Sequence, residues 1–388
     1  MAQTPTQKQV LSLRPTVVDI DLDALAANFE RIKALAAPAK VMPVLKANAY
    51  GHGLVASARV LEQCGAAAVG VAYLEEGMAL RRAGLKLPIL SLSGISCDQL
   101  SGFLDYGIDI TASSLMKLEA VEEQAAARGV RARVHLKIDT GMERTGVHYY
   151  SAEKLLVRAL TLRHSEVVGI YSHFATSESE DLSFTRSQLE RFLECCSFFE
   201  KQGHAVPLRH IANTAALLRL PESRLDMVRP GLMLYGVSPS SNPACRMDLT
   251  PVLALRSKVV YFKVVQAEAG VSYDLTWRAP KQTRVITVPI GYGDGYSRRL
   301  SNCGGVLVRG RRYPIVGRVC MDQIMVDIGD GEAYNGDEVV LIGNQAGQRI
   351  TVEEIAELTE MDPREVCLSL NSRVPKRFHY QGREWVEE

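Results

Sequence analysis

The sequence contains no long hydrophobic run and no long basic run. None of its uninterrupted apolar stretches reaches the roughly 18 residues that a membrane-spanning helix needs, so we expect no contact with a membrane. The first residues, MAQTPTQKQVLSLRP, lack the apolar core of a signal peptide, which predicts a cytoplasmic protein. Lys and Arg number 45 and Asp and Glu 44, without a long basic run, so we expect no binding of nucleic acid.

Paired cysteine motifs are also absent. The eight cysteines form no CxxC pair and do not stand at zinc-ligand spacing with the histidines, so the sequence predicts reduced thiols and no metal site. At 388 residues, with 47% hydrophobic residues, the chain can bury a large core. This composition excludes a disordered chain and a small disulfide-stapled protein.

Short apolar runs alternate with helical patterns from residue 41 to about 235. Such alternation is typical of a parallel sheet whose strands are buried on both faces. A count of eight units predicts a (β/α)8 barrel, with an open, doubly wound sheet as the structural alternative. The predicted strands are 41–45, 68–73, 88–92, 108–112, 133–138, 167–171, 208–211 and 232–235.

The pattern changes after about residue 245. Alternating residues and Gly-rich turns predict a mostly-β domain over 246–388, following a barrel domain over 1–245 whose first residues could join the β domain. The composition of SPSSNPACR, residues 238–246, is that of a linker. A short helix is predicted after Thr351, which is its expected N-cap.

Polar residues follow several of the predicted barrel strands. Because catalytic groups of barrel enzymes lie at the C-terminal ends of the strands, we expect one shared site there, although each residue alone could simply solvate a loop. Lys46 is the strongest candidate for a catalytic residue, since a partly desolvated lysine has a lowered pKa and can form a Schiff base. The alternative is a lysine that extends its ammonium group to solvent. The other residues at these positions are Lys137, Arg144, His173, Thr214 and the segment 229–231.

Nine motifs, in order along the chain, resemble those of bacterial alanine racemases, which use pyridoxal 5′-phosphate. Three of them are VLKANAYGHG (44–53), KIDTGMER (137–144) and RPGLMLYG (229–236). The others are SHFA (172–175), ANT (212–214), VSY (271–273), GYGDGY (291–296), CMD (320–322) and RVP (373–375).

The resemblance implies a cofactor-binding (β/α)8 barrel followed by a β-rich domain. It also implies interconversion of L- and D-alanine, the supply of D-alanine for peptidoglycan, and a head-to-tail homodimer whose subunits share their active sites.

Four residues receive catalytic roles from the resemblance. Lys46 would hold the cofactor and act as the base on the D-specific face of the substrate's α-carbon, and Tyr273 would be the base on the opposite face. His173 would be the partner of that tyrosine, which needs help because a free tyrosine has a pKa near 10. Arg229 would face the pyridine nitrogen and, being cationic, leave it unprotonated. Each could instead have an ordinary core or surface role.

The remaining roles concern binding. Hydroxyl and backbone donors of a phosphate site are implied at Tyr50, Thr214, Gly231 and Leu232, and Asn213 is a further residue of the cofactor site. Arg144 would contact the cofactor's phenolic oxygen and the substrate carboxylate. Lys137 would be N-carboxylated to orient Arg144, or else remain unmodified and pair with Asp139. From the β domain, Tyr292, Met321 and Asp322 would line the entrance and reach the substrate carboxylate in the partner subunit.

Two positions depart from the family pattern. Asp274 stands where many members have Gly, and Asp tolerates the left-handed backbone that such a turn needs. Ser372, assigned here to the cofactor site, replaces a Tyr that contacts the phosphate in some members, and the extra room could admit serine. A racemase of broader specificity, a decarboxylase and a non-enzymatic cofactor carrier are therefore alternatives. Arg229 argues against the decarboxylase, and Tyr273 against the carrier.

Overall fold

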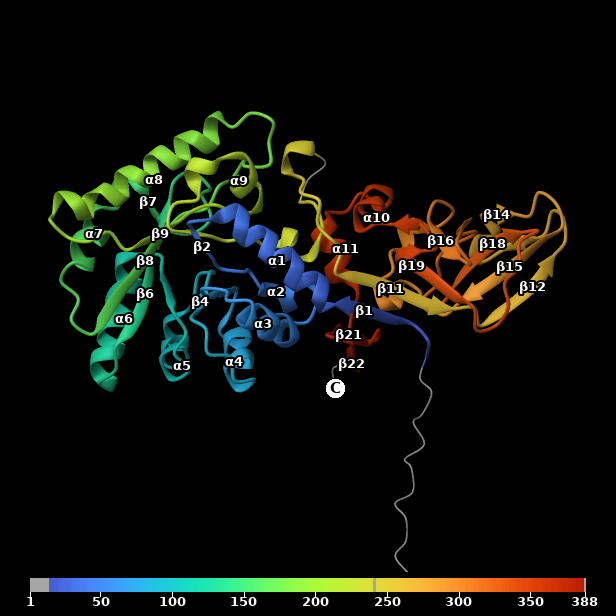
Figure 1. Cartoon of the computed structure of the whole chain (residues 1–388), viewed down its shortest axis with the longest axis horizontal. Coiled ribbons are helices and arrows are strands. Elements are labelled where there is room, and N and C mark those ends of the chain that lie inside the picture. The colour runs from blue at the N-terminus through green and yellow to red at the C-terminus, as the bar shows by residue number, and fades with distance from the viewer. Residues whose placement is uncertain (1–13, 240–241, 387–388) are drawn as a thin grey trace, which may run out of the picture.

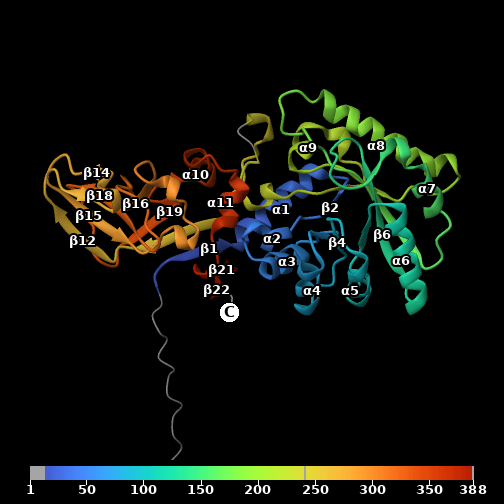
Figure 2. The same cartoon turned by 180° about the vertical axis from the view of Figure 1, so that it is seen from behind.

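The computed structural model describes residues 14–239 and 242–386 and has two regions side by side along its longest axis. The N-terminal region is a barrel surrounded by helices, and the C-terminal region is rich in strands (Figures 1 and 2). The predicted fold class is therefore confirmed.

The barrel contains eight parallel strands within the described residues. Bridges join Val44 to Gly70 and Leu90 to Asp109, and a hydrogen bond of 3.2 Å from Asp226 N to Arg209 O links the last two strands, so the ring closes. This closure decides against the open sheet. The strands are β2 (Lys40–Val41), β3 (Val69–Val71), β4 (Ile89–Ser91), β5 (Ile110–Ala112), β6 (Ala132–Asp139), β8 (Ser165–Tyr171), β9 (Leu208–His210) and β10 (Met227–Val228).

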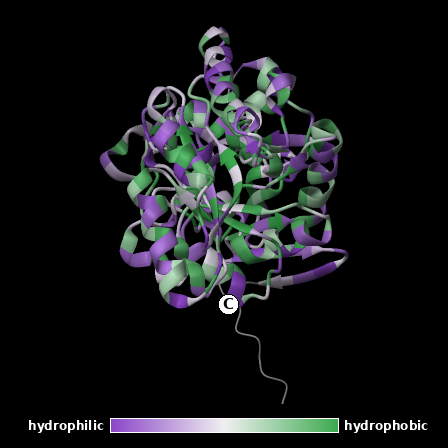
Figure 3. Ribbon diagram, turned by 90° about the vertical axis from the view of Figure 1, so that its left-hand side faces the viewer, coloured by the Kyte–Doolittle hydropathy of each residue, from purple (hydrophilic) through white to green (hydrophobic). Residues whose placement is uncertain are grey.

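Helices cover the outside of the barrel. Their apolar faces turn inward, and Figure 3, which views the molecule from the barrel side, shows hydrophobic segments gathered inside and hydrophilic ones on the periphery. The helices are α1 (Leu22–Ala36), α3 (Leu54–Gln63), α4 (Leu74–Arg82), α5 (Leu100–Asp105), α6 (Leu115–Arg128), α7 (Glu153–Ala159), α8 (Ser183–Lys201) and α9 (Thr214–Arg219). Between β6 and α7, the short strand β7 (Val147–His148) pairs with β6.

One predicted strand is wrong. Residues 232–235 form a 3-10 helix, η4 (Leu232–Tyr235), and the eighth barrel strand is β10, directly before Arg229. The run LMLY is fully buried, so its apolar composition resembles that of a buried strand. It is buried because it packs against α1, whose Asn28 Nδ2 donates to Leu234 O at 3.0 Å.

The C-terminal region is built on an eight-stranded sheet in the order β17-β16-β19-β11-β1-β21-β22, with β20 paired to β19. Strand β1 (Val17–Asp21) comes from the N-terminus and pairs with β11 and β21, so it links the two regions. The domain boundary at residue 245 stays a prediction. The other strands of this sheet are β11 (Leu253–Lys258), β16 (Gly305–Val308), β17 (Arg311–Pro314), β19 (Glu338–Gln345), β20 (Gln348–Ile350), β21 (Lys376–Tyr380) and β22 (Arg383–Val386).

Smaller elements extend this region. The helix predicted after Thr351 is α10 (Val352–Thr359), and the Thr351 side chain accepts from Glu354 N, which confirms the N-cap. Of the predicted linker, residues 240–241 lie outside the described residues, and a single turn, η5 (Pro243–Cys245), follows them. The remaining strands and α-helix are β12 (Tyr261–Val265), β13 (Gly270–Val271), β14 (Trp277–Arg278), β15 (Thr283–Val288), β18 (Ile324–Gly329) and α11 (Pro363–Ser369). Within the described ranges, every helix is too short or too polar to cross a membrane.

Candidate active site

A cavity of about 910 Å³ lies at the C-terminal ends of the barrel strands. All ten barrel residues that the sequence analysis singled out for the site contribute to its lining, so the structure brings them together. They are Lys46, Tyr50, Lys137, Arg144, His173, Asn213, Thr214, Arg229, Gly231 and Leu232.

Lys46 begins a backbone turn of unusual handedness, labelled α2 (Lys46–Tyr50). The next four residues have φ angles of +52° to +54°, which is the left-handed helical region. For residues other than glycine this conformation costs roughly 1–2 kcal/mol each. Surrounding contacts must therefore hold the turn in place.

Three side chains hold this turn. Glu76 accepts from Ala47 N at 2.6 Å, and Asn48 Oδ1 accepts from Leu54 N at 2.7 Å. His52, fully buried, places Nδ1 2.9 Å from Tyr50 O and 3.1 Å from Ala49 O. Burial lowers the pKa of His52 to about 4, so the ring is neutral at pH 7 and donates from Nδ1.

The amine of Lys46 lies in a positive environment. Burial lowers its pKa, and the charges of Arg144 and Arg364 lower it further, while Glu76 opposes them. A larger fraction of the amine is therefore neutral at a given pH than for an exposed lysine, and the neutral form is the one that acts as base or nucleophile.

Arg229 is buried at the wall of the cavity. One Nη atom is 2.8 Å from His210 Nδ1, and the other donates to Ser172 O at 2.6 Å and Ile211 O at 3.2 Å. Burial lowers the pKa of Arg229 to about 10, so the side chain is still a cation at pH 7. Its fixed position and charge suit a contact with an unprotonated ring nitrogen.

Three further groups lie around Arg229. His173 Nδ1 is 3.3 Å from an Nη atom of Arg229, and burial and that charge hold the pKa of His173 well below its usual value. Lys137 Nζ lies 4.2 Å from the ring centre of Tyr171, and burial, with Arg229 and Arg144 nearby, holds its pKa well below the ordinary range. Tyr171, which the sequence analysis missed, contacts both side chains with its ring, since the guanidinium carbon of Arg229 lies 5.2 Å from the same ring centre.

Asp139, the alternative partner of Lys137, instead organises the loop that carries Arg144. Its carboxylate accepts from the N–H groups of Gly141 and Met142 at 2.8 and 2.9 Å and from Arg144 N at 3.1 Å. Backbone donors thus occupy this carboxylate, and they fix where the loop enters the cavity.

Small neutral donors gather at another part of the wall. Thr214 Oγ1 accepts from Gly231 N at 3.0 Å, and Asn213 Oδ1 accepts from Ala216 N at 3.0 Å as the N-cap of α9. A Cβ on Gly231 would lie 2.7 Å from Tyr50 Oη, so only glycine lets the backbone come this close. We call Tyr50, Thr214, Gly231 and Leu232 the donor cradle.

The site residues predicted in the β-rich region lie elsewhere. Tyr273, Tyr292 and Met321 are 69%, 43% and 51% exposed, and Asp322 is exposed as well. The residues that line the barrel cavity of the same chain, all from described ranges, do not include any of the four. One chain by itself therefore places its two sets of predicted site residues apart.

These four residues nevertheless form one cluster of loops, called here the loop cluster. Tyr292 N donates to Cys320 O at 3.0 Å, and Gly293 N to Met321 O at 2.9 Å. A Cβ on Gly291 would lie 2.2 Å from Cys320 O, so the loops touch directly. Tyr273 joins the same cluster, because Ser272 Oγ donates to Arg318 O at 2.8 Å.

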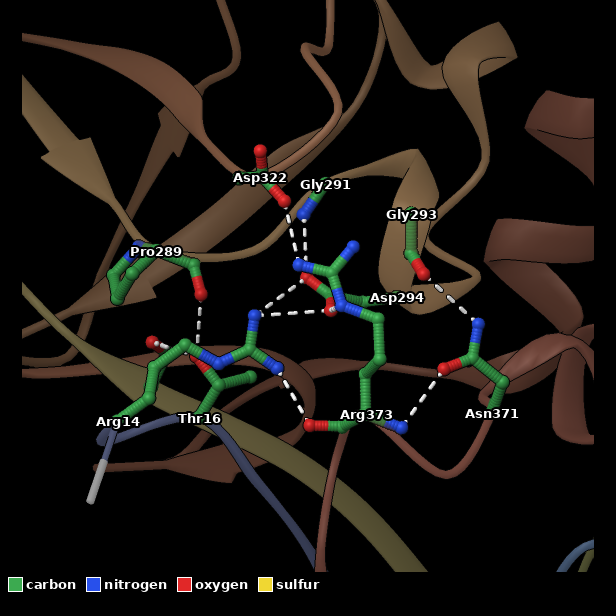
Figure 4. A network of polar contacts seen from close by, with 10 residues as sticks. Arg14, Thr16, Pro289, Gly291, Gly293, Asp294, Asp322, Asn371 and Arg373 are labelled. Atoms are coloured by element: carbon green, nitrogen blue, oxygen red, sulfur yellow. Dashed lines mark hydrogen bonds and ion pairs between the residues drawn. The ribbon is translucent and has the colours of Figure 1, made fainter.

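A polar network adjoins the loop cluster through Gly291, Gly293 and Asp322 (Figure 4). The buried carboxylate of Asp294 accepts from Arg14 Nη1 at 2.9 Å and from Gly291 N at 3.0 Å, and it lies 3.3 Å from Arg373 Nε. Arg373 also donates to Asp322 at 2.5 Å. The network thus joins the N-terminal segment to both loops that present predicted substrate-binding residues.

The two departures from the family pattern have clear positions. Asp274 has φ +60° and ψ +5°, so the left-handed turn expected there is confirmed, and its carboxylate lies 2.6 Å from Arg318 Nε. Ser372 is exposed and is not among the residues that line the cavity. Two cavity residues from α11, Arg364 and Leu368, escaped the sequence analysis because no motif marks them.

Among residues 14–239 and 242–386, no group of three or more His, Cys, Asp or Glu side chains is placed to hold a metal ion.

Comparison with known families gives matches over both regions. Residues 20–239 match the family described as "Alanine racemase, N-terminal domain", and residues 252–378 match "Alanine racemase, C-terminal domain". Alanine racemase 2 of Caldanaerobacter subterraneus subsp. tengcongensis is 41% identical over 373 residues, which cover 95% of this chain and 96% of the relative. Alanine racemase 2 of Bacillus subtilis is 39% identical, with 95% and 96% covered.

Solved structures are similar over the same length. The alanine racemase of Clostridium difficile 630 has a TM-score of 0.90 and 34% identity, covering 97% of this chain and 99% of that one. The alanine racemase of Bacillus anthracis with bound L-Ala-P has a TM-score of 0.88 and 35% identity, covering 98% of each chain.

Proposed function

The chain belongs to the alanine racemase family, and on this premise we propose that it interconverts L- and D-alanine with pyridoxal 5′-phosphate held on Lys46. The observation that carries the proposal is the convergence of ten predicted residues on one barrel cavity. The D-alanine formed would supply peptidoglycan synthesis in the cytoplasm.

The residues present fit this cofactor. The donor cradle offers hydroxyl and backbone N–H groups to a phosphate, and its glycine leaves room beneath Tyr50 Oη. Lys46 has the lowered pKa that a covalent attachment needs, and Arg229 is a fixed cation for the pyridine nitrogen. When bound, the cofactor supplies an electron sink for the electron pair left on the substrate's α-carbon after loss of its proton.

Racemisation requires acid–base groups on both faces of the α-carbon. Lys46 serves the D-specific face, where its neutral amine accepts a proton and its ammonium form returns one. The partner subunit's Tyr273 serves the opposite face, and His173 is the group that assists that tyrosine. Because Tyr273 is exposed and outside the cavity of its own chain, we propose a head-to-tail homodimer in which each active site draws on both subunits.

Other residues orient the substrate and limit side reactions. Arg229 keeps its protons at neutral pH and donates a hydrogen bond without transferring one, so it leaves the ring nitrogen unprotonated and favours return of the proton to the α-carbon. Arg144, with the partner's Met321 and Asp322, binds the substrate carboxylate, and the partner's Tyr292 lines the entrance. The lowered pKa of buried Lys137 favours a neutral amine, the form that can be N-carboxylated and then orient Arg144.

Chiral analysis tests the proposal directly. The purified protein, loaded with pyridoxal 5′-phosphate, is incubated with a pool of L-amino acids, and we expect D-alanine to dominate the products. Substantial D-serine would show a racemase of broader specificity, and a cofactor-loaded protein that forms no D-amino acid would refute racemisation.

A variant of the lysine tests the attachment. K46A removes the covalent link and one base, so we expect loss of the visible absorbance of the bound cofactor and a fall in rate of about 10³-fold or more. K40A, at an exposed lysine on β2 outside the cavity, is the matched control and should retain both. An unchanged absorbance in K46A would contradict the assignment.

A further inference from the structure

The cavity contains a cation that none of the roles above uses. Arg364 lies in the first turn of α11, near the C-terminus, yet it lines the barrel cavity beside Tyr50 and Leu368. Helix α11 packs on the turn that carries the cofactor lysine, because a Cβ on Gly51 would lie 2.6 Å from Cys367 O. The position of Arg364 is therefore fixed relative to Lys46 and Tyr50.

Two carboxylates hold Arg364 in place. Its Nη2 donates to Glu178 Oε1 at 2.7 Å and its Nη1 to Asp362 Oδ2 at 2.8 Å. A guanidinium group carries five N–H donors, so three remain beyond these two contacts. Such an arrangement orients the group without using up its capacity to bind an anion.

The charge of Arg364 reaches the functional groups of the cavity. It lowers the pKa of Lys46, after burial and Arg144, and it opposes the effect of burial that raises the pKa of Tyr50 to about 12. The guanidinium group is thus electrostatically coupled to one member of the donor cradle.

The donor cradle itself consists of uncharged groups. Tyr50 and Thr214 offer hydroxyls, Gly231 and Leu232 offer backbone N–H groups, and the Gly231 N–H already donates to Thr214. A phosphate dianion held by neutral donors alone would lose much of its hydration with no opposite charge in return. Ser372, the residue first assigned to this contact, is exposed and outside the cavity.

We propose that Arg364 binds the phosphate group of the cofactor and supplies the positive charge that the donor cradle lacks. This inference rests on the proposed function, since it takes pyridoxal 5′-phosphate as the ligand. It makes α11, an element of the C-terminal region, part of the cofactor site of its own chain.

Paired titrations test the proposal. Cofactor is removed from the full-length protein, which is then titrated with pyridoxal 5′-phosphate and, separately, with pyridoxal, which has no phosphate; bound ligand is followed by its absorbance. For R364Q we expect affinity for pyridoxal 5′-phosphate to fall about 10- to 100-fold, as for a lost charge-assisted hydrogen bond, with affinity for pyridoxal unchanged. R364K keeps the charge and should retain most of the preference for the phosphorylated ligand.

The controls separate this claim from others. R186Q removes an arginine that pairs with Glu222 outside the cavity, and it should leave both affinities unchanged. Unchanged affinity in R364Q, or an equal loss for both ligands, would overturn the proposal. A raised KM for alanine at unchanged cofactor affinity would also overturn it, because that result would assign Arg364 to substrate binding. Failure of the wild-type protein to bind either ligand would instead overturn the proposed function.

Discussion

The barrel cavity and the loop cluster hold their polar groups in different ways. In the cavity, Arg229 and Lys137 are buried, and burial shifts their pKa values strongly. In the loop cluster, Tyr273 and Tyr292 are exposed, while the backbone beneath them is tightly hydrogen-bonded. In the cavity, a single chain already fixes the pKa shifts of the side chains. In the loop cluster, a single chain fixes only the positions of the side chains. Exposed aromatic side chains on a rigid support are typical of a surface that another molecule covers.

The largest expected effect tests whether the cavity of one subunit works together with the loop cluster of its partner. We expect Y273F to lower racemisation by about 10²- to 10⁴-fold, because one of the two proposed bases is lost, while cofactor absorbance remains. Mixing Y273F with K46A, each nearly inactive, should restore activity by random exchange of subunits. Half of the dimers then carry one intact site of two, so about a quarter of wild-type activity returns. No recovery despite demonstrated exchange would place both bases in one chain.

The second prediction concerns the barrel turn and pH. Burial lowers the pKa of His52 to about 4 from 6.5, so the unfolded state binds more protons between these values. This contribution leaves stability intact above pH 6.5 and reduces it progressively as the pH falls to 4, by about 3 kcal/mol in total. Urea unfolding of wild type and H52N, at fixed protein and cofactor concentrations, should show a smaller loss between pH 7 and 4.5 in the variant. An equal loss of stability in wild type and H52N would contradict the assignment of this pH dependence to His52.

The third prediction concerns the network that adjoins the loop cluster. D294N removes the buried charge that Arg14 and Arg373 share, and we expect the free energy of unfolding to fall by about 2 kcal/mol, since both arginines are partly exposed. The loops of Tyr292 and Met321 should also lose alignment, which raises the KM for alanine while cofactor affinity stays the same. D330N, at an exposed carboxylate, is the control. A parallel loss of cofactor affinity would show that the network supports the whole protein rather than these loops.

The smallest effect is expected at Asp274. Replacing it with glycine removes the cost of holding a non-glycine residue in the left-handed conformation, but it also removes a largely exposed ion pair with Arg318. These two effects on the free energy of unfolding have opposite signs, so we expect a net change within about 1 kcal/mol. D274N keeps the backbone preference without the charge and separates the two terms. Thermal unfolding of both variants checks the balance, and a loss well above 1 kcal/mol in D274N would show that the ion pair matters more than its exposure suggests.

Much of the barrel could be predicted from the sequence because apolar periodicity and motif order both report on it. The prediction of a strand at 232–235 was wrong because a segment buried against α1 and a strand buried in a sheet have the same apolar composition. The ten cavity residues that were predicted lie within contiguous motifs, so the sequence could assign them. Arg364 could not be found in this way, because its place in the cavity depends on how α11 packs against a turn more than 300 residues earlier. Tyr171 reads as a core aromatic until its neighbours Lys137 and Arg229 are located in space.

The left-handed turn after Lys46 has a consequence for the order of folding. Four consecutive residues adopt a conformation that their own preferences oppose by about 4–8 kcal/mol in total, so the segment cannot form this turn in isolation. It requires Glu76 from α4, and Asn48 and His52 once α3 has docked. The turn should therefore form late, after the surrounding barrel. Lys46, the residue proposed to hold the cofactor, then reaches its working geometry only in a chain that has already folded correctly.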